Sequence, residues 1–256
     1  MSLLRLEDVS KIFGGLIAVN DLSFTVEQGS IVGLIGPNGA GKTTVFNCIT
    51  GNYTPETGDI FFDDQSIAGL RPHRIVSLGI ARTFQSIRLF GRLPVLENAL
   101  AGRHCRMKAG LIACMLHTAA QRREEKEAVA RCMEELCFVG LAKHYAEPAG
   151  GLSYGNQRLL EIARALASDP RLLILDEPAG GMNEQETVAL VETIQSIRNR
   201  GITVLLIEHD MRLVMKICEK LVVLEHGSMI VQGKPEDVQR NPDVIEAYLG
   251  ADDMKW

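Results

Sequence analysis

A glycine-rich segment between two apolar runs constrains the fold of this chain more than any other feature. The run Ile31 to Ile35 is typical of a buried strand, and the residues from Lys42 until Gly51 lack glycine and proline, as expected of a short helix. Between them stands GPNGAGK, which together with Thr43 completes the pattern G-x-x-x-x-G-K-[ST]. This order of strand, glycine loop and helix predicts the phosphate-binding unit of an α/β fold.

The residue types in this loop suit a polyphosphate. The three glycines let the backbone wrap closely around an anion, so that successive N–H groups and the start of the helix converge on it. The lysine supplies a positive charge for the outer phosphates, the first threonine can ligate Mg²⁺, and the second can donate to an inner phosphate. A glycine-rich turn that caps an ordinary helix is the alternative, but it needs neither lysine nor threonine at these offsets. The predicted nucleoside triphosphate site comprises Gly36, Pro37, Asn38, Gly39, Ala40, Gly41, Lys42, Thr43 and Thr44.

Two acidic residues at the end of a second apolar run complete this predicted site. Residues 171–177 read RLLILDE, which implies a buried parallel strand whose acids emerge at the carboxyl edge of the sheet, where α/β proteins bind ligands. Asp176 then fits a ligand of Mg²⁺, and Glu177 is placed to act as general base toward the attacking water. An acidic pair after a strand is usually only the polar start of a loop, but the phosphate loop favours the functional interpretation.

The rest of the chain predicts further strands and helices around these motifs. The stretch from Glu97 to Phe138 is polar and rich in alanine, which favours solvated helices, and its RREEKE run is better explained as a solvated helix face than as a docking patch. After Gly151 strands and helices alternate. We expect strands at Leu3–Val9, Leu22–Val26, Asp59–Asp63, Arg171–Leu175 and Ile202–Ile207, helices at Tyr154–Ala167 and Glu184–Arg200, and then a further helix and a hairpin that contains Gly227.

Composition disfavours several other classes of protein. Lys and Arg number 27 against 32 Asp and Glu, so the net charge of −5 offers no overall basic field for nucleic acid. The longest apolar stretch, Ala109 to Leu116, is far shorter than the ~20 residues of a membrane-spanning helix. No secretory signal is visible in residues 1–10, and we expect a cytoplasmic chain. The six cysteines, at positions 48, 105, 114, 132, 137 and 218, form no Cys-x-x-Cys pair and are expected to be reduced and mostly structural.

These motifs resemble those of the ABC ATPases, the nucleotide-hydrolysing subunits of ABC transporters, along essentially the whole chain. LSYGN at residues 152–156 resembles the family signature, Gln85 in ARTFQ the Q-loop, His209 in LLIEHD the switch histidine, and Phe13 in KIFGG the adenine-stacking position. The resemblance implies an α/β P-loop NTPase (RecA-like) core with an N-terminal antiparallel β subdomain and an inserted α-helical subdomain. It places the core with its β subdomain in residues 1–90 and 158–256 and the helical subdomain in 91–157 of a single domain, 1–256.

The resemblance also implies roles for these additional residues. Gln85 would contact Mg²⁺ and the catalytic water and form the hinge to the helical arm, while His209 would donate to the γ-phosphate and orient the general base. Ser153, at the start of a helix, and the N–H of Gly155 would form an anion site for the γ-phosphate bound by the opposite subunit, so two active sites require two subunits. Without the family, Ser153 is a plain helix cap, Phe13 a core residue, Gln85 a surface amide and His209 an incidental loop residue.

Three residues depart from the general family pattern, and one of them points to a subgroup. Tyr154, Asn156 and Asn183 stand where the family has Gly, Gln and Asp, which puts the strength of coupling between subunits in question. Tyr154, together with IGPNGAGKTT, RTFQSIRLF, IEHDM and NPDVIEAYLG, resembles the cassette subunits of branched-chain amino acid importers.

This resemblance implies a set of partners. We expect ATP, Mg²⁺, a second cassette that is the same or a homologous chain, membrane permease subunits docked between the Gln85 loop and the helical arm, and indirectly a substrate-binding protein. The chain would then lie on the cytoplasmic face of the inner membrane. The alternative is a soluble ABC ATPase that acts mechanically on a macromolecular partner, but such members carry tandem cassettes, long coiled-coil insertions or basic surfaces. A small-molecule kinase that shares only the phosphate loop would need neither LSYGN nor His209.

Overall fold

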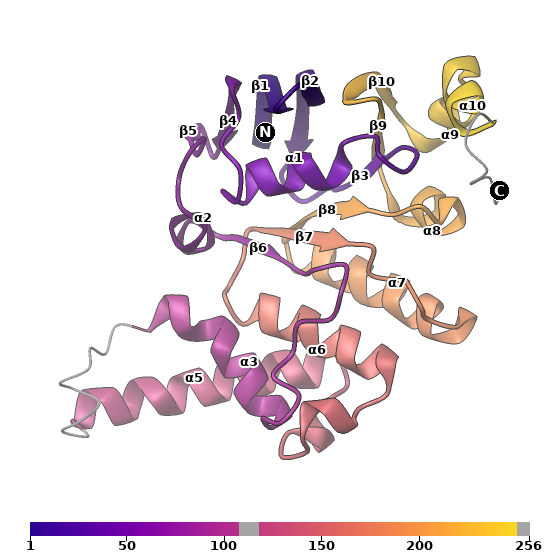
Figure 1. Ribbon diagram of the computed structural model, residues 1–256. Helices are drawn as coiled ribbons and strands as arrows, with labels where there is room; N and C mark the ends of the chain where they lie inside the picture. The colour runs from indigo at the N-terminus through magenta and orange to yellow at the C-terminus, as the bar shows by residue number, and fades with distance from the viewer. Residues whose placement is uncertain (108–117, 250–256) are drawn as a thin grey trace.

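Two β-sheets with helices between and around them make up the computed structural model, which describes residues 1–107 and 118–249 (Figure 1). The sequence-based expectations for Ala109–Leu116 and Cys114 lie outside these residues. None of the helices in the described ranges combines the length and the apolar character that crossing a membrane needs. The five cysteines that lie in these ranges are free thiols, as expected.

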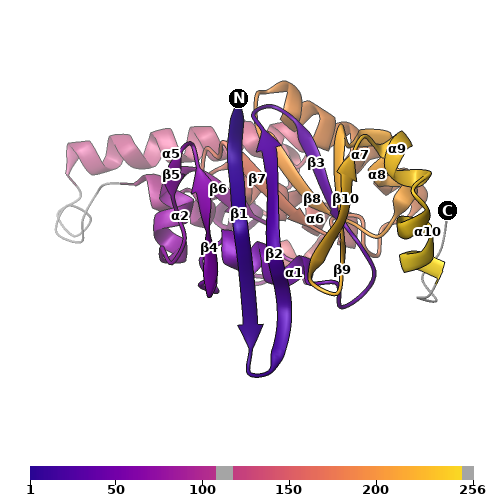
Figure 2. The ribbon, with the colours of Figure 1, turned by 90° about the horizontal axis from the view of Figure 1, so that it is seen from above.

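The smaller sheet is antiparallel and has the order β2-β1-β4-β5. Its strands are β1 (Ser2–Phe13), β2 (Leu16–Glu27), β4 (Thr57–Phe62) and β5 (Gln65–Ser66). β1 and β2 form a long hairpin that projects from the molecule (Figure 2) and pairs Phe13 with Leu16 at its tip. These strands are longer than expected, because the tip is exposed and its residues do not alternate between core and solvent. β4 ends before Asp63, which has a positive φ of 53° and begins a turn.

The larger sheet has the order β10-β9-β3-β8-β7-β6, and only β10 runs antiparallel to its neighbour. Its strands are β3 (Ile31–Ile35), β6 (Ile80–Arg82), β7 (Leu172–Asp176), β8 (Thr203–Ile207), β9 (Lys220–Glu225) and β10 (Ser228–Gly233). Every residue of β3, β7 and β8 is buried, which confirms the buried parallel strands expected from the continuous apolar runs. The hairpin containing Gly227 is β9–β10.

One helix, α1 (Lys42–Ile49), lies between the two sheets (Figure 1). Its Val45, Phe46 and Ile49 are fully buried in a hydrophobic cluster that also includes side chains of both sheets. The neighbouring helix α2 (Pro72–Leu78) and the three-residue strand β6 were not expected from the sequence, because neither is long enough to show a clear period.

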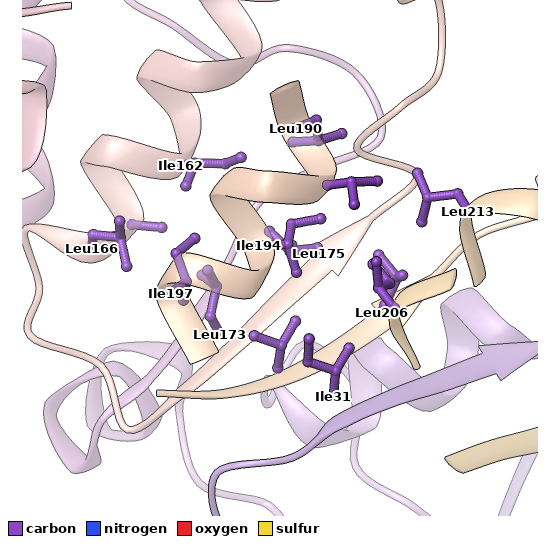
Figure 3. Close-up of a cluster of buried hydrophobic side chains, with 14 of the residues drawn as sticks. Ile31, Ile162, Leu166, Leu173, Leu175, Leu190, Ile194, Ile197, Leu206 and Leu213 are labelled. Atoms are coloured by element: carbon purple, nitrogen blue, oxygen red, sulfur yellow. The ribbon is translucent and has the colours of Figure 1, made fainter. Parts of the chain in front are cut away.

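Three further helices cover the other face of the larger sheet: α6 (Tyr154–Leu166), α7 (Glu184–Asn199) and α8 (Met211–Ile217). Figure 3 shows Ile194 and Leu190 of α7 and Ile162 of α6 in one apolar cluster with Leu175 and Leu206 of the sheet. The C-terminal helices α9 (Pro235–Gln239) and α10 (Pro242–Leu249) pack near β9 and β10. The observed α6 and α7 match the expected helices to within one residue at each end.

The helical arm contains α3 (Val95–Arg103), α5 (Ala119–Phe138) and the short 3₁₀ helices His104–Arg106, Ala142–His144 and Ala149–Gly151. α3 packs against both α5 and α6. Only one stripe of α5 is buried, so the polar residues around it form the solvated faces that the sequence predicts. Helix α6 continues across residues 157 and 158, where the sequence-based division places the end of the helical subdomain.

Candidate functional site

The glycine loop takes its path from two close backbone contacts. Gly36 has a φ of 147°, and a Cβ atom there would lie 2.1 Å from the carbonyl oxygen of Leu224. Gly41 has a φ of 100°, and a Cβ atom there would lie 2.4 Å from the carbonyl oxygen of Ala18. Both the positive φ and the lack of space therefore require glycine, and the loop is fixed between β9 and β2.

Lys42 lies at the centre of this loop. Its Nζ donates to the carbonyl oxygens of Gly36 at 2.6 Å and Pro37 at 2.9 Å, and the residue is buried. Lys42 is also the first residue of α1, whose first turn carries no acidic residue. The partial positive charge of this helix end and the ammonium group therefore act in the same direction, toward an anion held by the loop.

A cavity of about 450 Å³ opens beside the loop. Phe13 lies at its rim, with 40% of its surface exposed and its ring against that of Tyr53 at a centroid distance of 5.1 Å. Phe13 is thus a surface aromatic rather than a core residue. The lining combines most of the loop with residues distant in sequence, namely Phe13, Leu16, Ile17, Ala18, Asn38, Gly39, Ala40, Gly41, Lys42, Thr43, Thr44, Gln85, Glu177 and His226.

Two candidate catalytic side chains approach the carboxylate of a third, Glu177, at the edge of this cavity. Glu177 follows β7, has a positive φ of 46°, and its N–H donates to the carbonyl oxygen of Ile207 at 3.0 Å. The Nε2 of Gln85 donates to Oε2 of Glu177 at 2.9 Å. The Nδ1 of His209 lies 3.9 Å from the same oxygen. The parallel sheet thus brings together Gln85 and Glu177, which are 92 positions apart in the sequence.

A second cavity, of about 400 Å³, brings together Thr43, Gln85 and Asp176. Their hydroxyl, amide and carboxylate oxygens are the hard ligands that Mg²⁺ prefers. The described residues contain no group of three or more His, Cys, Asp and Glu side chains that could hold a metal ion. The donor set in this cavity therefore fits magnesium better than zinc or another transition metal.

Arg82 belongs to this site but was not found from the sequence. Its Nη2 lies 2.7 Å from Oδ2 of Asp176, and its Nη1 donates to Oδ1 of Asn47 at 2.7 Å. The guanidinium lies 5.6 Å and 5.4 Å from the ring centroids of Phe46 and Phe84. Arg82 supplies the counter-charge that lets Asp176 be buried. A charged residue at the end of the short apolar run before Gln85 was the available signal.

A buried carboxylate next to His209 was also missed. Glu208 is 1% exposed, and it accepts hydrogen bonds from the N–H of Ala179 at 2.9 Å and from the N–H of His209 at 3.2 Å. Burial raises the pKa of Glu208 above the usual range of a glutamic acid. Its two bonds join the backbone before α8 to the loop that follows Glu177.

Ser153 and Gly155, in contrast, lie away from the loop of the same chain. Ser153 is the exposed N-cap of α6, and its hydroxyl accepts from the N–H of Asn156 at 3.3 Å. Gly155 packs against Glu186 of α7, where a Cβ atom would lie 2.6 Å from Oε1. Both residues lie in the described part of the chain, and neither lines the two cavities beside the loop.

Asn183 has a local structural role. It caps α7 in a capping box with Glu186, in which the Asn183 side chain accepts from the N–H of Glu186 and the Glu186 side chain accepts from the N–H of Asn183. The replacement of the usual Asp by Asn therefore keeps a competent helix cap.

Two family models match this sequence. Residues 19–180 match the model described as ABC transporter, and residues 228–254 match the model described as branched-chain amino acid ATP-binding cassette transporter. Together they cover the glycine loop, Gln85, the signature, both acids and the C-terminal NPDVIEAYLG segment.

Curated proteins and solved structures are similar along almost the whole chain. The high-affinity branched-chain amino acid transport ATP-binding protein LivG of Salmonella typhimurium is 48% identical over 239 residues, which are 93% of this chain and 94% of that protein. BraF of Pseudomonas aeruginosa, described in the same words, is 46% identical and covers 97% of this chain and 98% of its own length. A crystal structure of the ADP conformation of an ATP-binding cassette of an ABC transporter has a TM-score of 0.86 and 33% identity, and covers 98% of this chain and 99% of the other.

Proposed function

The chain belongs to the ABC transporter family as an ATP-binding subunit, and from this membership we propose that it hydrolyses ATP to drive an importer of branched-chain amino acids. The observation that carries the proposal is the 48% identity, over 93% of the chain, to a transport protein named for that class of solute. The relatives named above are all transport proteins, so a soluble ABC ATPase that acts mechanically on a macromolecule is not supported.

In this proposal the cavity of about 450 Å³ receives ATP. The ring of Phe13 stacks on the base, because it is 40% exposed and lies at the rim of the cavity. The N–H groups of the loop and the start of α1 donate to the phosphates, and Lys42 shifts its ammonium from the carbonyls of Gly36 and Pro37 to the outer phosphate oxygens. The other loop residues, Asn38, Gly39, Ala40 and Gly41, supply backbone, and Thr44 supplies a hydroxyl.

The residues of the second cavity would hold Mg²⁺. Thr43, Gln85 and Asp176 provide its oxygen ligands, and the guanidinium of Arg82 keeps the carboxylate of Asp176 oriented. A magnesium ion bound there would offset the negative charge of the phosphates during phosphoryl transfer.

Glu177 is the proposed general base. It accepts a proton from the attacking water, and the hydrogen bond from Gln85 aims its carboxylate. The His209 side chain is 65% exposed and near the same carboxylate, so it can turn toward the outer phosphate and donate to it. The buried carboxylate of Glu208 holds the backbone of His209 in place for this motion.

A complete site requires a second cassette, either another copy of this chain or a homologous one. Ser153 is exposed at the N-terminus of α6, and Gly155 lies in the first turn of that helix, where hydroxyl and N–H groups can meet an anion. Neither residue lines the cavities beside the loop of its own chain. We infer that they cap the terminal phosphate of the nucleotide held by the partner cassette.

A membrane permease is the proposed partner at the helical arm. A groove of about 700 Å³ lies between the arm and the core, and its walls combine apolar residues such as Val76 and Phe90 with the basic residues Arg88, His104 and Arg164. A permease segment with apolar and acidic side chains would match it. The chain would then sit on the cytoplasmic face of the membrane and respond to a substrate-binding protein only through the permease.

Reconstitution tests this function. The chain is co-purified with permease subunits from the same organism and placed in liposomes with ATP inside. We expect uptake of leucine, isoleucine or valine that depends on ATP and on a substrate-binding protein added outside. Uptake of another class of solute would refute the assignment of substrate, and co-purification with ribosomes or DNA instead of a permease would refute transport itself.

A further inference from the structure

The backbone that carries Gln85 is hydrogen-bonded to the larger sheet up to Thr83 and to α6 from Phe84 onward. Up to Thr83 it belongs to the core, because the N–H of Thr83 donates to the carbonyl oxygen of Ile174 at 2.9 Å and its hydroxyl accepts from the N–H of Asp176 at 3.4 Å. These bonds continue the pairing of β6 with β7. The strand Ile80–Arg82 and Thr83 therefore move with the larger sheet.

From Phe84 onward the backbone is held by α6 instead. The guanidinium of Arg158 donates from Nη1 to the carbonyl oxygen of Phe84 at 2.7 Å and from Nη2 to the carbonyl oxygen of Gln85. Three residues later, the N–H of Arg88 donates to Oε1 of Glu161 at 2.8 Å, and Arg164 donates to the carbonyl oxygen of Arg88. The segment from Phe84 to Arg88 is thus attached to α6 at both ends.

Arg158 is suited to this attachment by its shape and its surroundings. It is 4% exposed, its charge is compensated by Oε2 of Glu161 at 3.2 Å, and its Nη2 donates to the hydroxyl of Tyr154 at 3.2 Å. A planar guanidinium can donate to two neighbouring carbonyl oxygens at once, which a single ammonium group cannot do with the same geometry. The roles assigned above do not use Arg158, Glu161 or the bonds to residues 84–88.

The same helix carries Ser153 at its N-cap, five residues before Arg158. Gln85 reaches back to Glu177 in the nucleotide site of its own chain, whereas Ser153 faces outward. We propose that Arg158 is a positioning residue that joins these two groups into one rigid unit, so that Gln85 at one nucleotide and Ser153 at the partner's nucleotide engage together. This inference rests on the proposed function, because it needs two nucleotides shared by two cassettes.

Arg158→Gln in the full-length chain, assembled with its partner subunits, tests the coupling. The affinity of a single chain for a fluorescent ATP analogue should stay within about twofold, because no contact of Arg158 lies in the loop. The kcat of ATP hydrolysis should fall about tenfold, and its Hill coefficient for ATP should fall toward one, a loss within the usual range of coupling between two sites. Arg158→Lys keeps the positive charge but not the planar group that donates two hydrogen bonds. Its kcat and Hill coefficient should lie between those of Arg158→Gln and those of the parent.

Arg200→Gln is the matched control. Arg200 forms a bidentate pair at 2.6 Å with the buried carboxylate of Glu135, so it also links core and arm across a buried charge, but it does not touch residues 84–88. It should lower thermal stability and leave the Hill coefficient unchanged. If Arg158→Gln is too unstable, the double variant Arg158→Gln/Glu161→Gln removes both buried charges and should show the same loss of cooperativity.

Two results would overturn the inference: a parental kcat and Hill coefficient in the Arg158 variants, or an equal loss in Arg200→Gln. A parent that neither hydrolyses ATP nor pairs with a second cassette would instead refute the proposed function. The parental assay therefore separates the two failures.

Discussion

The phosphate loop and the start of α6 are two helix ends in the same chain to which we assign anion binding, and they differ in how complete they are. The loop is closed by internal hydrogen bonds, because the ammonium of Lys42 donates to the carbonyl oxygens of residues 36 and 37. The start of α6 is open, because Ser153 is exposed and its hydroxyl contacts only the first turn of its own helix among the bonds of the described residues. One end has its own cavity and the other borders none of the cavities around the loop.

The difference shows where this polypeptide needs a partner. In the proposed function the loop binds a triphosphate with groups from its own chain, and it is held between β9 and β2. The α6 end lies on a helix that packs against the arm, and in the proposed function it completes the site of another cassette. Substitutions in the loop should therefore change nucleotide binding by a single chain, whereas those at α6 should act only after two cassettes meet.

Glu177→Gln should give the largest effect, on the loop side of this comparison. Removal of the general base should slow ATP hydrolysis by at least ~100-fold while ATP binding is retained. Steady-state phosphate release and a nucleotide titration measure the two quantities. Glu184→Gln, at an exposed residue in the first turn of α7, is the control and should hydrolyse ATP at the parental rate. Near-parental turnover by Glu177→Gln would remove Glu177 from its proposed role.

Lys42→Ala should weaken triphosphate binding by a single chain. The loss of a charge-assisted donor corresponds to about 2 kcal/mol, or about thirtyfold in Kd. Fluorescence titration with an ATP analogue measures it. Lys220 also donates from its ammonium to a backbone carbonyl, that of Thr25, at 3.2 Å, but it lies outside the cavity beside the loop, so Lys220→Ala is the control. An unchanged Kd for Lys42→Ala would contradict the assignment of the loop.

Ser153→Ala should leave the Kd of a single chain unchanged and lower hydrolysis by the assembled pair about tenfold, since one hydrogen bond to a charged phosphate is lost. Part of any effect could come from the lost helix cap, which is typically worth about 1 kcal/mol of stability. Thr118→Ala removes an equivalent cap from α5, where Thr118 accepts from the N–H of Gln121, and should lower stability without lowering the rate. Equal rate losses in both variants would reduce Ser153 to a structural residue.

Phe13→Ala should have the smallest effect. Stacking of an aromatic ring on a base contributes about 1–3 kcal/mol to the binding free energy. Because the Phe13 ring is 40% exposed, we expect the low end of this range, which is about fivefold in Kd. The titration should show this loss for ATP but none for inorganic triphosphate, which has no base. The ammonium of Lys11 lies 5.1 Å from the centroid of the Phe13 ring, and the guanidinium of Arg5 lies 4.6 Å from that of Phe61. Phe61 does not line the cavity, so Phe61→Ala is the control.

The local parts of this structure could be predicted from sequence. Ile31–Ile35 and the helix that starts at Lys42 agree with the sequence-based expectation, because a continuous apolar run, positive-φ glycines and a helix without glycine or proline are all local signals. The hairpin tip around Phe13 was missed because its residues bury nothing that would show a period. The strand Ile80–Arg82 was missed because three residues carry too little pattern.

The parts of the site that escaped prediction depend on distant backbone atoms. Arg82 and Arg158 look like ordinary charged residues in the sequence, and their roles come from Asp176 and from the carbonyl oxygens of Phe84 and Gln85. Buried arginines of this kind are visible only once β6, β7 and α6 are placed side by side. Glu208, similarly, is defined by two N–H groups, one of which belongs to Ala179 in another loop.

A mixing experiment tests most directly whether Lys42 and Ser153 act on one nucleotide from two different chains. Pairs of identical Lys42→Ala or Ser153→Ala chains have both sites impaired, whereas a mixed pair contains one site with both residues intact. We predict that mixing the two purified chains restores ATP hydrolysis well above the mean of the separate preparations. A mixture that hydrolyses ATP no faster than that mean would contradict the shared site.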